Sequence, residues 1–126
     1  MDTAQQSNHL SLGRKGEDLA LAYLQALGYD ILERNWMHVH KELDIIAIDS
    51  DELVIVEVKT RTIPVLDSPQ RTVDLKKQRN MINAANAYIR YKRLSHAARF
   101  DIIWVVAGAD GSYDIKHYKE AFIPLL

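Results

Sequence analysis

The sequence predicts an α/β fold, with a mixed sheet of about five strands flanked by helices in the order αβββαββ. Two long segments carry apolar residues at helical spacing, and several short segments are rich in Val and Ile. Turn-forming residues separate these segments. A chain of 126 residues that is 48% hydrophobic fits a single domain with one core.

The first quarter of the chain predicts a helix and a short strand. Residues 1–10 are polar, so we expect a flexible N-terminal tail before a single domain of residues 11–126. A helix is expected over 12–27, where apolar residues form one stripe. Gly28 suits the left-handed residue that ends a helix. A β-prone segment, 29–36, follows.

The centre of the chain predicts a β-hairpin with strands over 42–49 and 53–59. The second strand is apolar on both faces until its end, which is typical of a central strand covered on both sides. If residues 50–51 form the turn, Asp44 lies directly across from Glu57.

The second half of the chain predicts one more helix and two more strands. Residues 60–72 contain two prolines and are expected to form a loop. A long helix is expected over 73–93, followed by strands over 99–106 and 113–119. Trp104 lies within an apolar strand, which favours a core position.

Composition excludes several classes of protein. The absence of cysteine excludes a disulfide scaffold, a zinc ribbon, an iron–sulfur cluster and a thiol nucleophile. The formal net charge is −1, so any surface that binds nucleic acid must be local. We find no apolar run long enough for a membrane span and no signal-peptide pattern, and we therefore expect a cytoplasmic protein without a membrane partner.

The predicted hairpin brings together groups that suit a metal site. Two opposed carboxylates, Asp44 and Glu57, would repel each other at a β-carbon separation of about 4.5–5.5 Å. A hard divalent cation, Mg²⁺ or Mn²⁺, would remove this repulsion, and we expect the Val58 carbonyl as a further oxygen ligand. Lys59 projects from the same strand face as Glu57. It is placed to orient or deprotonate a metal-bound water, or to stabilise a charged transition state.

Two alternatives involve the same strands. Lys59 would also oppose Glu42, so a structural surface ion pair worth about 0–1 kcal/mol is one alternative. His38 and His40 alternate with Glu42 and Asp44 on one strand face, and this pattern suits zinc or simple solvated histidines.

Several motifs in the chain resemble the YraN family of small bacterial proteins, within the restriction-endonuclease-like (PD-(D/E)xK) nuclease superfamily. The motifs are GRKGED (13–18), GYDILERN (28–35), ELDIIA (42–47), VEVKTR (56–61) and RFD (99–101), with Pro69, Val73 and Lys77. This resemblance implies a restriction-endonuclease-like fold, similar to that of archaeal Holliday junction resolvases. It implies a metal-dependent nuclease site at Glu17, Asp44, Glu57 and Lys59, and, by analogy with resolvases, a homodimer. Leu43 and Lys41 depart from the usual proline and glycine of these motifs.

Basic residues outside this core are candidates for nucleic-acid contacts through phosphate groups. They are Arg14, Lys15, Arg61, Lys76, Lys77 and Arg79. The leading hypothesis is therefore a Mg²⁺- or Mn²⁺-dependent DNA endonuclease acting on branched or single-stranded DNA. The alternatives are a non-catalytic nucleic-acid-binding or assembly protein that retains the fold, and a metal enzyme acting on a small phosphorylated molecule.

Overall fold

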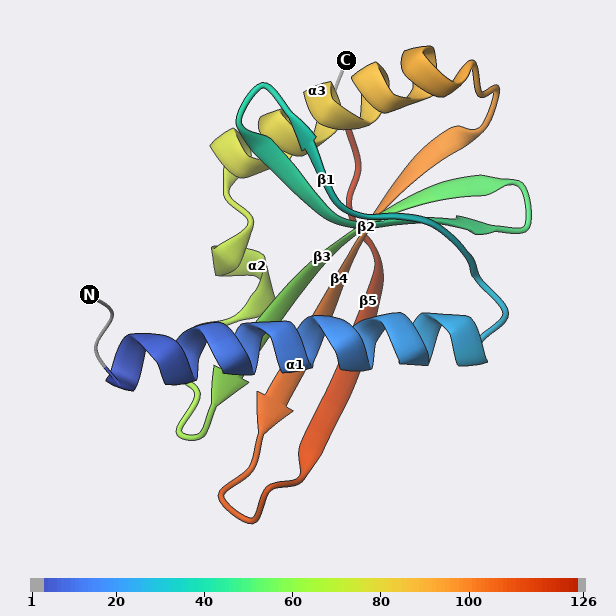
Figure 1. Cartoon of the computed structure of the whole chain (residues 1–126). Helices are drawn as coiled ribbons and strands as arrows, with labels where there is room; N and C mark the ends of the chain where they lie inside the picture. Colours follow the sequence, from blue (N-terminus) through green and yellow to red (C-terminus); the bar gives the residue numbers. More distant parts are fainter. Residues whose placement is uncertain (1–3, 125–126) are drawn as a thin grey trace.

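The computed structural model describes residues 4–124, with side chains from residue 10 onward, as a five-stranded mixed sheet flanked by helices (Figure 1). Its elements are α1 (Ala4–Ala26), β1 (Asp30–His38), β2 (Lys41–Asp49), β3 (Glu52–Thr62), α2 (Pro69–Thr72), α3 (Leu75–Lys92), β4 (Ala97–Ala107) and β5 (Tyr113–Phe122). The predicted α/β class and order are confirmed, with the short helix α2 added. This arrangement is consistent with a restriction-endonuclease-like fold.

The strands follow the order β1-β2-β3-β4-β5, so β3 occupies the centre of the sheet as predicted. Only the β3–β4 pair is parallel among these strands, because the connection between them passes through α3. One cluster of buried residues lies between the sheet and α3, and a second lies between the sheet and α1. Residues of β3 contribute to both clusters, which explains why this strand is apolar on both faces.

Helix α1 begins at Ala4, inside the segment predicted to be a flexible tail. Alanine and glutamine favour helix, so the backbone continues beyond the apolar stripe that marked the expected start. The helix ends as expected, since Gly28 adopts a positive φ of 91°. The Tyr29 N–H then donates to the Leu24 carbonyl at 3.0 Å, and the Tyr29 ring is buried.

The β2–β3 hairpin has the predicted register. Asp49 pairs with Glu52 across a two-residue turn, and the ladder continues to the pair formed by Ile45 and Val56. Beyond this pair β2 remains paired with β1, as far as Lys41. The β2–β3 ladder therefore ends one residue before Asp44, where the candidate site begins.

Candidate active site

Asp44 lies one residue beyond the last pair of the β2–β3 ladder. Its carboxylate Oδ2 accepts a hydrogen bond from the Val58 N–H at 2.8 Å. The ladder ends one pair before Asp44 and Glu57, so the predicted register holds but these two residues do not themselves form a ladder pair. The side chain of Asp44 instead bonds to the backbone of β3 just beyond the last ladder pair.

The surroundings of Asp44 disfavour its negative charge. Burial raises the pKa of Asp44, the nearby charge of Glu57 raises it further, and Glu17 adds a smaller effect. The hydrogen bond from Val58 and the charge of Lys77 act in the opposite direction. The net effect raises the pKa of Asp44 to about 7.

Glu57 is buried, with an exposed fraction of 3%, and its two oxygens have different surroundings. Oε1 forms ion pairs with Lys59 Nζ at 3.2 Å and with Lys77 Nζ at 3.4 Å. Oε2 is buried without a hydrogen-bond partner among the described residues. Lys59 thus pairs with Glu57 and not with Glu42, so the alternative of a Lys59–Glu42 surface pair is wrong.

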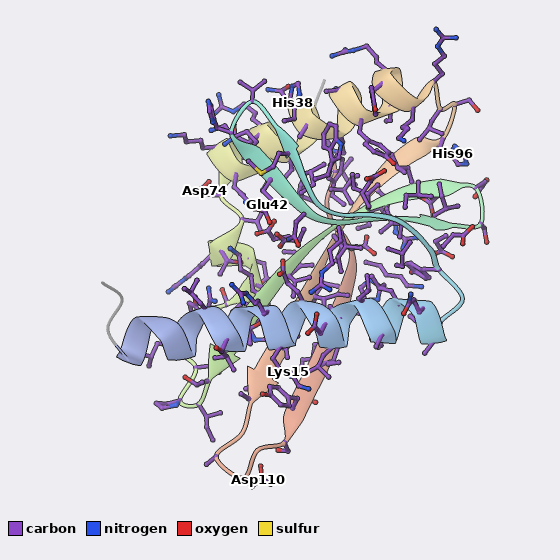
Figure 2. All side chains as sticks on the ribbon, viewed as in Figure 1. Lys15, His38, Glu42, Asp74, His96 and Asp110 are labelled. Carbon is purple, nitrogen blue, oxygen red and sulfur yellow. The ribbon has the colours of Figure 1, made fainter. Side chains whose placement is uncertain are left out.

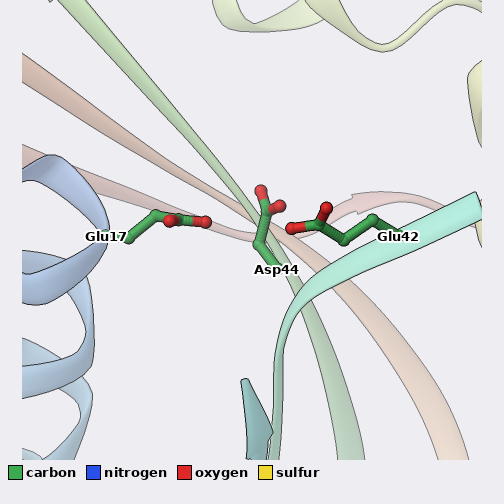
Figure 3. Close-up of side chains that lie close together, drawn as sticks. All are labelled: Glu17, Glu42 and Asp44. Atoms are coloured by element: carbon green, nitrogen blue, oxygen red, sulfur yellow. The ribbon is translucent and has the colours of Figure 1, made fainter. Parts of the chain in front are cut away.

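A third carboxylate, Glu42, joins the site. One oxygen each of Glu17, Glu42 and Asp44 lie within 4.8 Å of one another. Figure 3 shows Glu17 of α1 and Glu42 of β2 pointing toward Asp44 from opposite sides. This cluster contains no histidine, and the ring of His38 stacks on Trp36 with centroids 5.9 Å apart. The pattern of alternating acids on one strand could have identified Glu42 as a member.

The four residues of the predicted nuclease core line a single open cleft of about 890 Å³. Glu17 comes from α1, Asp44 from β2, and Glu57 and Lys59 from β3. The structure therefore brings together the residues that the resemblance indicated. Glu42 lines a smaller neighbouring cavity of about 240 Å³ together with Lys77.

The predicted nucleic-acid contacts fall into two groups: four exposed cations, and two cations that already have protein partners. Arg14 lines the cleft, and the other exposed members are Lys15, Lys76 and Arg79. Lys15 lies on α1 and Glu42 lies between α1 and α3 (Figure 2).

Arg61 and Lys77 already have protein partners. The Arg61 Nε donates to both carboxylate oxygens of Asp67 at 3.0–3.1 Å, and its guanidinium lies 5.3 Å from the centre of the Trp104 ring. Arg61 therefore fastens the loop after β3 to the sheet. Lys77 faces Glu57, so it belongs to the acidic centre more than to an outer binding surface.

The residues of the cleft fit a hard divalent cation. Carboxylate oxygens are the ligands that Mg²⁺ and Mn²⁺ prefer. The unpartnered Oε2 of Glu57 is an acceptor that lacks the bond a buried oxygen normally makes. The two lysines contact only the other oxygen of Glu57, so they leave Oε2 free for a ligand.

Comparison with known proteins assigns the chain to a family. The sequence model described as "Uncharacterised protein family UPF0102" matches residues 16–105. The chain belongs to the UPF0102 family. This is the YraN family that the motifs resemble, so that resemblance is confirmed. The matched segment contains Glu17, Asp44, Glu57 and Lys59.

Several UPF0102 proteins are similar over most of their length. The protein from Bacteroides thetaiotaomicron is 47% identical over 120 residues, which cover 95% of this chain and 98% of that protein. The protein from Parabacteroides distasonis is 47% identical over 111 residues, covering 88% and 91%. The protein from Porphyromonas gingivalis W83 is 43% identical over 120 residues, covering 95% and 89%. In the described part of the UPF0102 chain, no helix combines the length and apolar character needed to cross a membrane.

Proposed function

We propose that this protein is a divalent-metal-dependent nuclease that hydrolyses phosphodiester bonds of DNA. The observation that carries the proposal is the convergence of Glu17, Asp44, Glu57 and Lys59 on one cleft, where Glu57 keeps a buried oxygen without a partner. Mg²⁺ or Mn²⁺ suits this set of oxygen donors. Branched and single-stranded DNA are the forms that the family resemblance favours.

Asp44 and Glu57 would hold the ion, with the Val58 carbonyl as a further oxygen ligand. When bound, such an ion lowers the pKa of a coordinated water and offsets the charge that develops on the phosphate. The Val58 N–H keeps the Asp44 carboxylate in place through the bond at 2.8 Å. Glu17 adds negative charge at the cleft wall.

Lys59 would act on the reacting groups. Its ammonium lies 3.2 Å from Glu57 Oε1 and its side chain remains partly exposed in the cleft. From this position it can orient or deprotonate the attacking water, or donate to a phosphate oxygen in the transition state. Lys77 of α3 also pairs with Glu57. Glu57 would therefore stay fixed if Lys59 turned toward the substrate.

Exposed cations on both long helices would contact the DNA backbone. Arg14 and Lys15 lie on α1, which also supplies Glu17, and Lys76 and Arg79 lie on α3, which also supplies Lys77. Because the formal net charge is only −1, this contact area should be small and sensitive to salt.

The test compares the wild type, Lys59→Ala and the control Lys116→Ala on branched, single-stranded and duplex DNA, with Mg²⁺ and Mn²⁺ separately. Lys116 is exposed on β5 and lies outside the cleft lining, so its replacement should leave cleavage unchanged. We expect Lys59→Ala to cleave about 10²–10³ times more slowly, because one electrostatic stabiliser of the transition state is lost. Its binding of Mn²⁺ and of DNA should stay close to that of the wild type.

Two outcomes would contradict the proposal. Wild-type protein that binds DNA but cuts none of the three substrates with either ion would favour the non-catalytic alternative. Cleavage by Lys59→Ala at the wild-type rate would show that the reaction takes place outside this cleft.

A further inference from the structure

Asn35 of β1 connects two of the clustered carboxylates. Its side-chain amide Nδ2 donates to Glu42 Oε1 at 2.7 Å and to Glu17 Oε1 at 3.1 Å. Its backbone has a positive φ of 53°, a conformation in which asparagine is strongly enriched among non-glycine residues. Along β1 it lies between Arg34 and Trp36, whose partners on β2 flank Asp44. One amide group therefore holds carboxylates from α1 and β2 side by side, next to Asp44.

The three carboxylates of this cluster lack a cationic partner. Among residues 10–124, Glu17, Glu42 and Asp44 form no ion pair, whereas Glu57 forms two. Arg34 is adjacent to Asn35 in sequence but pairs with Asp18. Carboxylates held within 4.8 Å repel one another unless a cation or a proton intervenes. A neutral amide fixes their geometry without cancelling their charge.

A second feature, in the cleft beside this cluster, also favours a bound cation. Glu57 lines the cleft together with Glu17 and Asp44, and its buried Oε2 lacks a hydrogen-bond partner among the described residues. A buried carboxylate oxygen without a donor is unfavourable, and a metal ion is one of the few groups that satisfies it.

We propose that Glu42 is a further carboxylate ligand of the divalent-cation centre and that Asn35 is the positioning residue that holds it beside Glu17. This inference rests on the proposed function and extends its metal ligands beyond Asp44, Glu57 and Val58. It assigns the cluster of Glu17, Glu42 and Asp44 to cation binding and leaves Lys59 to the phosphate.

The test is calorimetric titration of Mn²⁺ alone into the full chain and its variants. We expect Glu42→Gln and Asn35→Gly each to weaken Mn²⁺ binding by about 10-fold or more, as losses of residues that support metal ligands do. Glycine tolerates the positive φ of residue 35, so this variant removes the amide and keeps the backbone conformation. The control Glu120→Gln changes an exposed glutamate of β5 and should bind Mn²⁺ as the wild type does.

Thermal unfolding without metal separates this role from a structural one. Glu42→Gln should not lower the metal-free midpoint, because it removes a like charge from the cluster, but it should reduce the rise in midpoint that Mn²⁺ causes. A lowered metal-free midpoint with unchanged Mn²⁺ affinity would overturn the inference.

The same titrations distinguish this inference from the proposed function. If Asp44→Asn loses Mn²⁺ while Glu42→Gln and Asn35→Gly bind it normally, the metal centre stands and the roles of Glu42 and Asn35 are refuted. If only Asn35→Gly binds normally, its positioning role is refuted. If the wild type itself binds no Mn²⁺, both the inference and the proposed metal centre fail.

Discussion

At the scale of single residues, the surroundings of Asp44 disfavour its negative charge. Burial and the charge of Glu57 raise its pKa to about 7, against 3.8 for an unperturbed aspartate. The native state therefore binds a proton at this carboxyl more tightly than the unfolded chain does. Between about pH 4 and pH 7 the contribution of Asp44 to stability falls as the pH rises, and it stays low above pH 7.

Asp44→Asn should therefore stabilise the metal-free protein at pH 8 by up to about 4 kcal/mol, since each unit of the pKa difference corresponds to about 1.4 kcal/mol. Asparagine keeps an oxygen that can accept the Val58 N–H and removes the charge that Glu57 repels. The advantage should shrink toward zero at pH 4, where the aspartate is protonated as well. Urea unfolding in EDTA at several pH values measures it. An advantage that is independent of pH, or a destabilised variant at pH 8, would show that the Asp44 charge is not the unfavourable element.

The sequence predicted some residues of the site and missed others for physical reasons. Alternation along a strand places Glu57 and Lys59 on one face, and hairpin pairing brings Asp44 near them, so local rules were sufficient. Asn35 carried no such signal, because its position depends on a left-handed backbone within β1. Lys77 reaches Glu57 from α3, and this contact between distant segments is outside the reach of local patterns.

At the scale of elements, α1 is held against β3 by a very close approach at Gly16. A β-carbon added there would lie 3.0 Å from Thr60 Cβ and even closer to Thr60 Oγ1. This contact sets the position of α1, and therefore of the neighbouring Glu17, relative to the strand that carries Glu57. Gly13, one turn earlier, has no atom of this kind within 4 Å.

Replacing these two glycines should have opposite effects. Gly16→Ala should destabilise the protein by about 1–3 kcal/mol, because it forces α1 away from the sheet, and it should weaken Mn²⁺ binding by displacing Glu17. Gly13→Ala should stabilise it by up to about 1 kcal/mol through helix propensity alone. Thermal unfolding and Mn²⁺ titration of both variants provide the comparison. Equal stabilisation by the two substitutions would contradict the close packing of α1 on β3.

The long elements were predictable and the short or nonlocal ones were not. Helical and strand periodicity identified both long helices and all five strands. Helix α2 spans only Pro69–Thr72, too short to show a period. Strand β3 extends to Thr62 because it pairs in parallel with β4 as far as Ala107, a partner that local sequence does not specify.

At the scale of the whole molecule, a buried polar network lies at the start of β3, at the opposite end of this strand from the cleft. Arg99 donates to both oxygens of Asp101 at 3.0 Å and also bonds to Asp49, Glu52 and Tyr29. Burial alone would raise the pKa of the fully buried Asp101, but hydrogen bonds from His117 and Arg99 outweigh it and lower that pKa. The network joins the β2–β3 turn to Tyr29, the residue just before β1, and to β4 and β5. The homodimer and the cytoplasmic location stay predictions.

Asp101→Asn should destabilise the protein by about 3–5 kcal/mol, because it leaves the buried Arg99 without its main counter-charge. The control Asp51→Asn, in the exposed hairpin turn, should change stability by less than about 0.5 kcal/mol. Urea unfolding at pH 7 measures both. A loss below about 1 kcal/mol for Asp101→Asn would mean that the network contributes little to the fold.

The most direct test of the metal centre is a crystal structure of the protein soaked with Mn²⁺, with the metal located by its anomalous scattering. The account predicts a Mn²⁺ peak in the cleft, with oxygens of Asp44 and Glu57 at about 2.0–2.6 Å. Lys59 should remain beside it, free of the metal. A fully loaded crystal without a peak between these two carboxylates, or with Mn²⁺ bound only elsewhere on the surface, would contradict the central claim.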